Sequence, residues 1–306
     1  MEKNNKKKIS IIIPYHNEEK NIIKTIKKIQ KQSYKNFEVL LINSSSTDTS
    51  FQIINNYIKT NKLKKFSNFN ENTIYPSDSK NLGIKKAKNK FIAFMDCGLT
   101  FDKNWLYNQV SFIEKNKLDF TVGILHTEAK NSFDAAVISQ TWGLNKKIPV
   151  IPGSLFNKKI FIKLGMFKVS RAGYDKMWLQ NLNKKYKIRK NKKISIKYDL
   201  DIHGKNYINL FKKIFNYSYH SSKFFYKKSL LYLSMPFVFI FLSFLFSPFF
   251  PLFLYLILRI IFPLMKCNNI FDILSFNILI KLLPVAIVLD VSRFLGYLKK
   301  ILNNIF

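Results

Sequence analysis

Three short runs of apolar, mostly β-branched residues mark the first hundred positions, at Ile9–Ile13, Phe37–Ile42 and Phe91–Met95. Continuous runs of this kind are typical of strands that are buried on both faces of a parallel sheet. Residues 18–30 and 51–58 follow the first two runs and place their apolar side chains at helical spacing. The order strand, helix, strand, helix, strand predicts right-handed βαβ crossovers and a parallel sheet.

In the second hundred residues the alternation of strands and helices is less regular. Helical spacing recurs at Trp105–Ile113, Phe133–Trp142 and Asp175–Leu182, and Phe120–Leu125 is a further predicted strand. We therefore expect an α/β fold of the Rossmann-like type, with a mostly parallel mixed sheet. This domain is expected to cover residues 1–205.

The composition changes sharply towards the C-terminus. Residues 229–265 hold a single charge, Arg259, and are otherwise dominated by Leu, Phe, Ile and Pro. Pro248 and Pro251 divide the stretch, which predicts a hairpin of membrane-associated helices. A third segment, 270–298, is interrupted by Lys281, Asp290 and Arg293 and is expected to lie in the membrane interface. A buried bundle in a soluble protein is the alternative, but so long a stretch with one charge rarely stays soluble.

The residues before the hairpin indicate how it is oriented. Residues 206–228 are rich in Tyr, Phe and Lys and are expected to form an amphipathic connector. Lys223, Lys227 and Lys228 precede the hairpin, and the positive-inside rule places this end in the cytoplasm. The apolar run behind residues 1–8 is too short for a signal peptide. We therefore expect attachment to the inner membrane, with the large domain on the cytoplasmic side.

The formal net charge of +33 is compatible with a nucleic-acid-binding protein. Only four of the 51 basic residues are arginine, however, and the lysines are scattered. No compact motif of aromatic residues and arginine is present that would recognise bases. We expect no specific nucleic-acid partner, whereas membrane lipid with anionic headgroups would suit this surface. Cys97 and Cys267 have neither metal-site nor disulfide spacing.

Polar segments follow the predicted strands directly. Pro14–Glu18 follows the first strand, Asn43–Asp48 the second, and Asp96–Gly98 the third, while Arg171–Asp175 precedes a later helix. The carboxyl ends of parallel strands form the edge at which open α/β sheets bind ligands. These segments therefore predict a nucleotide-binding enzyme.

Transfer of a sugar from a nucleoside diphosphate makes three chemical demands on such a site. It needs polar groups for the base and ribose, a divalent cation on the diphosphate, and a general base for the acceptor hydroxyl. Carboxylates or amides after the first two strands can bind the nucleoside. A carboxylate after a later strand can hold a hard cation, and a further carboxylate can accept the proton. The chain offers candidates for each role in that order.

The same segments resemble glycosyltransferase family 2, whose members have the GT-A fold and are inverting enzymes that use nucleotide sugars. The resemblance covers about residues 9–200, and the C-terminal segments are similar to those of membrane-attached bacterial members. The matching segments are Ile9–Glu19 for the opening strand and loop, Phe37–Asp48 for the second strand and its D-x-G-S-T-D loop, Ser79–Gly83 for the A-R-N-x-G segment, Phe91–Gly98 for the D-x-D or D-A-G metal strand, and Arg171–Asp175 for the E-D segment.

The resemblance implies a role for individual residues. Asp175 would be the catalytic base, and Asp96 would hold a Mg²⁺ or Mn²⁺ ion on the diphosphate. The residues implied in nucleotide binding are Pro14, Tyr15, Asn17, Glu18, Asn43, Ser45, Lys80 and Asn81.

Several positions depart from the family pattern. Asn43 replaces an Asp and offers the base a different donor and acceptor pattern, and Lys80 replaces an Arg and so lacks its bidentate fork. Tyr174 replaces the Glu of the E-D segment. Taken alone, Asp175 before a helical run would more often be a helix cap than a base.

The metal segment departs as well. Gly98 replaces the last carboxylate of D-x-D and leaves Asp96 alone, as in the D-A-G variants. His203 is a candidate to complete the site, although a loop histidine is more often an ordinary surface residue.

We therefore expect a membrane-attached inverting glycosyltransferase. It would move a sugar from a nucleotide-sugar donor, expected to be a UDP-sugar, to a lipid-linked or polysaccharide acceptor at the cytoplasmic face. The alternative is a non-catalytic membrane scaffold that keeps the GT-A fold and nucleotide binding, since Asn43, Gly98 and Tyr174 each remove a carboxylate from the site.

Overall fold

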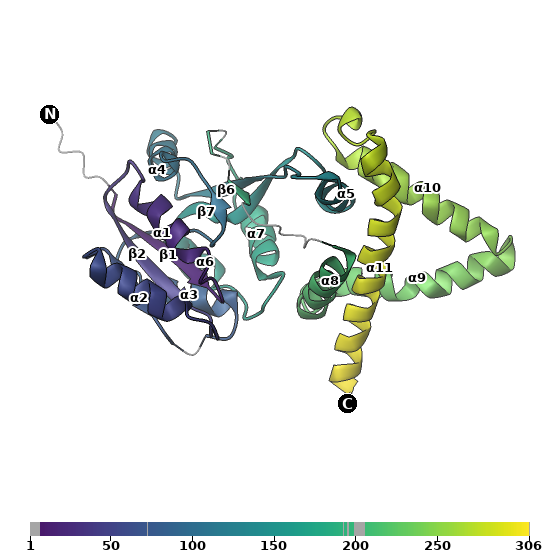
Figure 1. The fold of residues 1–306 in the computed structure, drawn as a ribbon, viewed down its shortest axis with the longest axis horizontal. Coiled ribbons are helices and arrows are strands. Elements are labelled where there is room, and N and C mark those ends of the chain that lie inside the picture. Colours follow the sequence, from purple (N-terminus) through teal and green to yellow (C-terminus); the bar gives the residue numbers. More distant parts are fainter. Residues whose placement is uncertain (1–6, 72, 192, 195, 199–205, 306) are drawn as a thin grey trace. The chain divides into compact units, whose positions relative to one another are not determined.

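The computed structural model describes residues 7–71, 73–191, 193–194, 196–198 and 206–305. The chain divides into two compact units (Figure 1). The first comprises Met1–Leu125 and Ile148–Leu200, and the second comprises His126–Lys147 and Asp201–Phe306. The segment 126–147, which the sequence places inside the first domain, therefore belongs to the second unit.

The first unit is built on a six-stranded sheet in the order β3-β2-β1-β4-β7-β6. β1 (Ile9–Tyr15) is parallel to both of its neighbours, β2 (Phe37–Asn43) and β4 (Phe91–Phe94), and β2 is parallel to β3 (Phe66–Phe69). The connecting helices are α1 (Ile22–Gln30), α2 (Ser50–Thr60) and α3 (Pro76–Lys86). This architecture confirms the predicted α/β fold with a mostly parallel mixed sheet.

The strand β7 (Lys147–Asn157) was not predicted from the sequence. It lies antiparallel to β4, with Ala93 opposite Leu155, and makes the sheet mixed. Pro149, Pro152 and Gly153 interrupt its apolar pattern, and such residues normally indicate a turn.

Gly153 allows β7 to bend where it passes beside β6 (Phe120–His126). Its backbone has a left-handed φ of 78°. The bend exposes the Gly153 carbonyl to two side chains of α4 (Trp105–Lys115), because the Trp105 Nε1 donates to it at 2.9 Å and the Gln109 amide donates as well. Both side chains are buried, so the Gly153 carbonyl is hydrogen-bonded inside the core.

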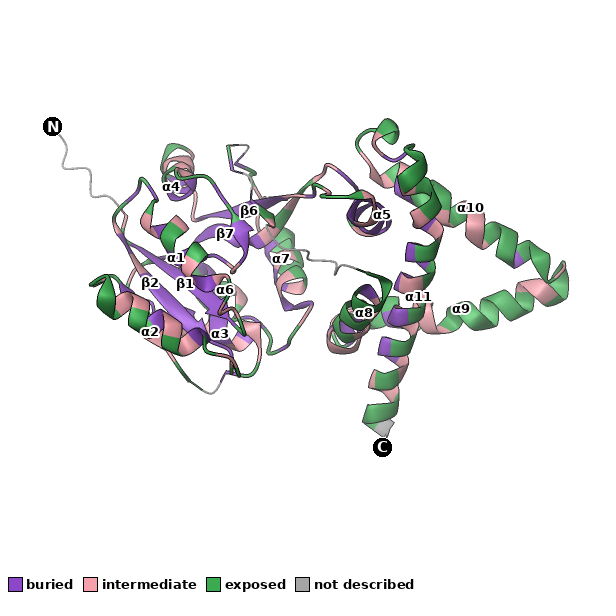
Figure 2. Cartoon of the chain, viewed as in Figure 1, coloured by how far each residue is buried: buried purple, intermediate pink, exposed green. Residues whose placement is uncertain are grey.

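The sheet carries a core on each face. Ile11 and Ile13 of β1 pack into the cluster that contains the apolar side chains of α1 and α4, whereas the intervening Ile12 meets α3. This alternation follows from the two-residue period of a strand. Every residue of β1 is buried, as Figure 2 shows in purple, which explains why its sequence is a continuous apolar run.

Gly83 sets the distance between α3 and the sheet. A Cβ atom at this position would lie 2.5 Å from the Cγ2 of Ile12, closer than real contacts allow. We expect Gly83→Ala to lower the free energy of unfolding by about 1–3 kcal/mol through overpacking. Thermal unfolding of the full chain measures this.

A double-mutant cycle provides the control for Gly83→Ala. Because Ile12→Ala removes the atoms that the new methyl would meet, the double variant should lose less stability than the sum of the two single losses. Additive losses would show that the contact between α3 and β1 is not the cause.

Shorter elements complete the first unit after β4. β5 (Leu99–Thr100) pairs antiparallel with β8 (Lys197–Tyr198) in a separate two-stranded sheet, with Leu99 opposite Tyr198. α6 (Lys159–Leu164) ends at Gly165, and α7 (Tyr174–Lys185) follows.

The second unit consists of helices. They are α5 (Ser132–Thr141), α8 (Tyr207–Ser221), α9 (Tyr226–Leu245), α10 (Phe249–Lys266), the single 3₁₀ turn η1 (Ile270–Asp272) and α11 (Phe276–Ile305). α9 and α10 form the predicted hairpin, with Pro248 at the turn.

Two of these helices, α9 and α10, are long and apolar enough to cross a membrane. Only 6% and 11% of their apolar windows are buried, and Figure 2 draws both helices largely in green. The core helix of a soluble protein would instead be mostly buried, so both helices are candidate membrane spans. The third segment begins with η1 and continues as the 30-residue helix α11, which runs through Lys281, Asp290 and Arg293 without a break.

Candidate active site

Lys80 of α3 contacts two of the polar segments predicted to form the site, one that contains Asp96 and one that contains Tyr174. Its Nζ lies 3.1 Å from Oδ1 of Asp96, directly after β4, and donates to the Tyr174 hydroxyl at 3.1 Å. The Lys80 side chain is only 3% exposed, whereas that of Asp96 is 29% exposed. A buried ammonium group is therefore held between a strand-end carboxylate and the first residue of α7.

The electrostatics bring Asp175 into the same group. Burial alone lowers the pKa of Lys80, but Asp96, Tyr174 and Asp175 outweigh it and raise the pKa above its usual range. Burial raises the pKa of Tyr174 to about 12, despite the opposing effect of Lys80, so this hydroxyl keeps its proton at neutral pH. Both Asp96 and Asp175 act electrostatically on Lys80, so the two carboxylates lie in its vicinity.

Helix α3 also fixes the backbone of the segment that leads to Asp175. The Asn81 side chain donates to the Phe167 carbonyl at 2.8 Å and accepts from the Phe167 N–H at 3.0 Å. One turn earlier, the Ser77 hydroxyl donates to the Ser170 carbonyl and accepts from its N–H, both at 2.8 Å. Asn81 thus contributes by holding this segment in place, whereas the sequence associates it with the nucleotide.

Aromatic packing anchors α7 from the other side. Trp178 stacks on Phe161 of α6 with ring centroids 4.9 Å apart, and its Nε1 donates to the Gly165 carbonyl at 2.9 Å. Gly173, with a left-handed φ of 80°, turns the chain into the helix. Asp175 follows in the first turn of the helix and is half-buried.

The loop after β1 is tied to the loop after β2. Asn17, which has a positive φ of 53°, accepts from the Thr47 N–H at 2.8 Å through its side-chain oxygen. The Glu18 N–H donates to the Ser50 hydroxyl at 2.8 Å, which joins α1 to the start of α2. Burial and the neighbouring carboxylates Asp48 and Asp96 raise the pKa of Glu18, although a hydrogen bond from Asn21 opposes this. Glu18 therefore lies near Asp96 at the sheet edge.

Pro14 and Tyr15 contribute less directly to this edge. Both are buried at the end of β1, and the Tyr15 hydroxyl donates to the side chain of Asn68 in β3 at 2.8 Å. Their side chains therefore shape the base of the site from within the core.

Asn43 at the end of β2 is only 3% exposed. Its amide donates to Asn70 at 2.7 Å and its oxygen accepts from the Ser46 N–H at 3.0 Å, so both ends of the side chain have protein partners. Ser45, exposed and with a φ of 53°, donates to the Thr73 carbonyl at 2.8 Å.

A chain of buried hydroxyls joins this loop to α3. The hydroxyls of Ser44 and Ser79 share a hydrogen bond, Ser79 donates to Thr73 at 2.8 Å, and Thr73 donates to the Asn43 carbonyl at 2.6 Å. The chain fixes the loop after β2 against the helix that carries Lys80. No single one of these hydroxyls stands out in the sequence, because only the fold brings the three segments together.

A cavity of about 530 Å³ opens beside Asn43 and is lined by Asn70, Glu71, Thr73 and Leu82. Its volume falls in the range of small-molecule sites. A larger cavity, of about 760 Å³, lies between the start of β2 and α4 and includes Asn36 and Glu114. It is at the opposite end of β2 from Asn43, away from the carboxyl edge of the sheet.

Asp96 is the carboxylate that the sequence associates with a divalent cation. In residues 7–198 and 206–305, apart from the positions not described, no group of three or more His, Cys, Asp or Glu side chains could hold a metal. Mg²⁺ sites, however, often combine one or two protein carboxylates with substrate phosphates. Asp96 is partly exposed, and its Oδ1 accepts no well-formed hydrogen bond from the described residues. His203 lies outside the described residues.

Tyr198 is a site residue that sequence reasoning missed. β8 places it opposite Leu99, just after Asp96, and burial together with Asp96 raises its pKa, which Lys80 opposes. The alternation of Ile194, Ile196 and Tyr198 is a strand signal that could have identified this position.

The comparisons with known proteins identify the family of the chain. Residues 10–182 match the family model described as glycosyl transferase family 2. An uncharacterized glycosyltransferase of Rickettsia bellii (strain RML369-C) is 37% identical over 114 residues, which are 37% of this chain and 16% of that protein.

Two further proteins of known activity are similar. The Escherichia coli UDP-Glc:alpha-D-GlcNAc-diphosphoundecaprenol beta-1,3-glucosyltransferase WfgD is 32% identical over 116 residues, 38% of this chain and 44% of that protein. The mannosyltransferase PcManGT from Pyrobaculum calidifontis, solved with GDP-Man and Mn²⁺, has a TM-score of 0.58 and 14% identity over 98% of this chain and 88% of its own, a likeness of fold. The matches to both sequence relatives cover less than half of each relative's length.

Proposed function

Because the chain belongs to glycosyltransferase family 2, we propose that it transfers a sugar from a UDP-sugar to a lipid-linked or polysaccharide acceptor. The observation that carries this proposal is the contact of Lys80 with both Asp96 and Tyr174, since it unites the metal segment with the segment bearing the base. The name of the Escherichia coli relative specifies a UDP-sugar donor and a diphosphoundecaprenol acceptor, which supports both choices.

In the proposed reaction, Asp175 accepts the proton of the acceptor hydroxyl as its oxygen attacks the anomeric carbon. The bond to the nucleoside diphosphate breaks in the same displacement, so the configuration inverts. Asp96 would hold a Mg²⁺ or Mn²⁺ ion, which supplies positive charge for the departing diphosphate. The helix-end position of Asp175 and the clamp from Ser77 and Asn81 keep the base aligned with the donor.

The cavity beside Asn43 is the proposed nucleoside site. Its polar lining and its place after β3, where Asn70 bonds to Asn43 at the end of β2, support this assignment. Asn43 would contact the base after its hydrogen bond to Asn70 is released, and Glu18 would contact the ribose or sugar from the β1 loop. The exposed apolar surface of α9 and α10 supports attachment to the inner membrane, with the site in the cytoplasm.

A screen of nucleotide sugars tests the proposal. We expect the full chain to bind UDP and a UDP-sugar more tightly with Mn²⁺ than with a chelator. Asp96→Asn should remove this Mn²⁺-dependent gain, weakening binding by about tenfold or more, because one carboxylate is the main protein ligand. Titration calorimetry measures the binding, and release of UDP in the presence of an acceptor measures turnover.

Asp102→Asn is the matched control, because Asp102 also follows the β4 segment but hydrogen-bonds locally to the Asn104 N–H. It should leave the Mn²⁺ effect unchanged. If neither Mn²⁺ nor Asp96→Asn changes the affinity for UDP, the assignment of Asp96 as a metal ligand is contradicted. Binding without any turnover over a full panel of sugars would favour the scaffold instead.

A further inference from the structure

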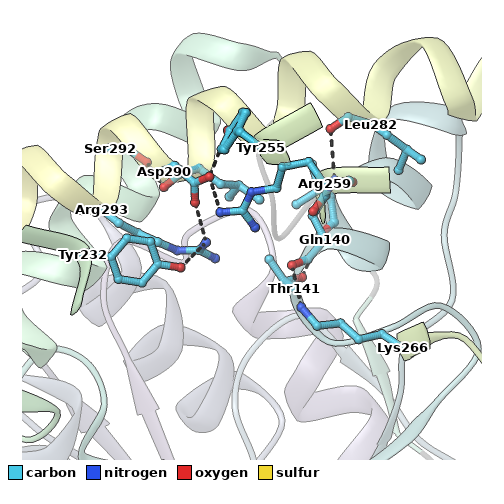
Figure 3. Close-up of polar contacts among 12 residues, drawn as sticks. Gln140, Thr141, Tyr232, Tyr255, Arg259, Lys266, Leu282, Asp290, Ser292 and Arg293 are labelled. Atoms are coloured by element: carbon cyan, nitrogen blue, oxygen red, sulfur yellow. Dashed lines mark hydrogen bonds and ion pairs between the residues drawn. The ribbon is translucent and has the colours of Figure 1, made fainter. Parts of the chain in front are cut away.

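A polar cluster lies within the three C-terminal helices of the second unit (Figure 3). It comprises Arg259 of α10, Asp290 and Arg293 of α11, and two tyrosines, Tyr232 of α9 and Tyr255 of α10. The side chains of Arg259, Asp290 and Arg293 are only 13–14% exposed. The sequence singles out these charges only as interruptions of an apolar pattern.

Asp290 is the common partner in this cluster. It forms an ion pair with Arg259 and accepts from the Tyr255 hydroxyl at 3.0 Å. Its other oxygen lies 3.4 Å from Nη1 of Arg293, which also donates to the Tyr232 hydroxyl at 3.0 Å. Both guanidinium groups lie over tyrosine rings, 5.5 Å from their centres. The arginines are therefore oriented by fixed contacts.

The charges in the cluster do not balance. Asp290 is the only acidic residue in the sequences of α9, α10 and α11, yet it faces two guanidinium groups. Lys266 interacts electrostatically with both arginines and donates to the Gln140 carbonyl at 3.1 Å. Two positive charges are thus left in excess among apolar helices, where an unpaired charge is costly.

The cluster lies near the basic end of the hairpin. Tyr232 is six residues from the start of α9, and Arg259 is seven residues from the end of α10. At 1.5 Å per residue, both lie about 10 Å from the end that carries Lys227, Lys228 and Lys266. This depth corresponds roughly to the boundary between lipid headgroups and hydrocarbon, which long arginine side chains can reach.

We propose that Arg259 and Arg293 bind the phosphate group of an anionic lipid. Two guanidinium groups can offer several N–H donors to phosphate oxygens, and Lys266 adds a third positive charge. Asp290 holds the arginines in position and competes with the phosphate for them. The phosphate belongs either to a bilayer phospholipid or to a polyprenyl lipid, and the proposal is independent of sugar transfer.

Lipid titration of the full chain in detergent micelles tests this site. Binding of fluorescently labelled phosphatidylglycerol and of a polyprenyl monophosphate is compared with that of diacylglycerol, which has the same apolar chains but no phosphate. Arg259→Gln with Arg293→Gln should weaken binding of the phosphate lipids by at least about tenfold. Lys299→Gln with Lys300→Gln removes two charges from the same helix α11 and should change binding by less than about twofold.

Asp290→Asn distinguishes a phosphate-binding role of the cluster from a purely structural role. Removing the competing carboxylate should strengthen phosphate-lipid binding, whereas a purely structural cluster would lose binding in this variant as in the arginine variants. If Asp290→Asn does not fold, the double variant Arg259→Lys with Arg293→Lys replaces it in the test. This variant keeps both positive charges, so it should retain more phosphate-lipid binding than the double Gln variant.

The relative affinities of the two phosphate lipids identify the source. Tighter binding of the polyprenyl phosphate indicates the polyprenyl lipid, and tighter binding of phosphatidylglycerol indicates the bilayer. Equal binding of diacylglycerol, or undiminished binding in the Arg259→Gln and Arg293→Gln variant, would overturn the proposal.

Discussion

Asp175→Asn is expected to lower sugar transfer by about 10²–10⁴-fold while UDP binding changes by less than about twofold. The amide cannot accept the proton of the acceptor hydroxyl, but it has nearly the same shape as the carboxylate. The Asp175 carboxylate accepts a hydrogen bond from the neighbouring Lys176 N–H, which an amide oxygen can also accept. Turnover of a UDP-sugar and calorimetric binding of UDP provide the two measurements.

Asp78→Asn is the matched control for this prediction. Asp78 also lies half-buried in the first turn of a helix, α3, and so shares the favourable dipole interaction of Asp175. If Asp175 served only to begin its helix, the two substitutions would have similar small effects on stability and neither would stop transfer. Normal sugar transfer by Asp175→Asn would therefore contradict the assignment of Asp175 as the catalytic base.

Lys80→Met should damage both stability and turnover. It removes a fully buried ammonium group and leaves Asp96 without its ion-pair partner, which costs about 2 kcal/mol because Asp96 is itself partly exposed. Loss of the hydrogen bond to Tyr174 also frees the start of α7, and a misplacement of about 1 Å there would reduce turnover by roughly 100-fold. Thermal unfolding and turnover of the full chain measure the two effects.

Lys86→Met provides the comparison on the same helix. Lys86 pairs with Glu71 at the surface, where an ion pair contributes at most about 1 kcal/mol. We expect near-normal unfolding and turnover for this variant. A Lys80→Met protein that is equally stable and active would show that the buried contacts do not organise the site.

The pH dependence of the Lys80 contribution follows from its raised pKa. A raised folded-state pKa means that the contribution is complete below the ordinary value of 10.5 and declines only as pH rises through the higher folded-state pKa. The stability difference between the natural protein and Lys80→Met should therefore be constant between about pH 6 and pH 9. If the stability difference decreases between about pH 6 and pH 9, a group other than Lys80 is responsible for it.

The parallel half of the sheet could be predicted because burial on both faces leaves a direct pattern in the sequence. β1, β2 and β4 are continuous apolar runs, and the helices between them repeat at helical spacing. β7 could not be predicted in this way. Its prolines and Gly153 suit a bent strand whose exposed carbonyl is bonded by Trp105, a contact between residues 48 positions apart.

The candidate site shows the same division. The order of the polar segments predicted one site containing Asp96, Lys80 and Asp175, and the structure places Lys80 beside Asp96. The sequence assigned Lys80 and Asn81 to the nucleotide, whereas the described contacts are to Tyr174 and to the Phe167 backbone. Tyr198 was missed because its strand is two residues long and pairs with a segment nearly a hundred residues earlier.

The sequence by itself determined the family, the α/β order of the first unit, and the apolar hairpin near the C-terminus. These features depend on periodicity and on short motifs, which are local properties of a chain. Only the tertiary structure decided which polar groups share a site. Lys80 and Tyr174 are 94 residues apart, and Arg259 and Asp290 are 31 apart. Such pairs form because packing brings distant segments together, and no local pattern specifies which buried charge finds which partner.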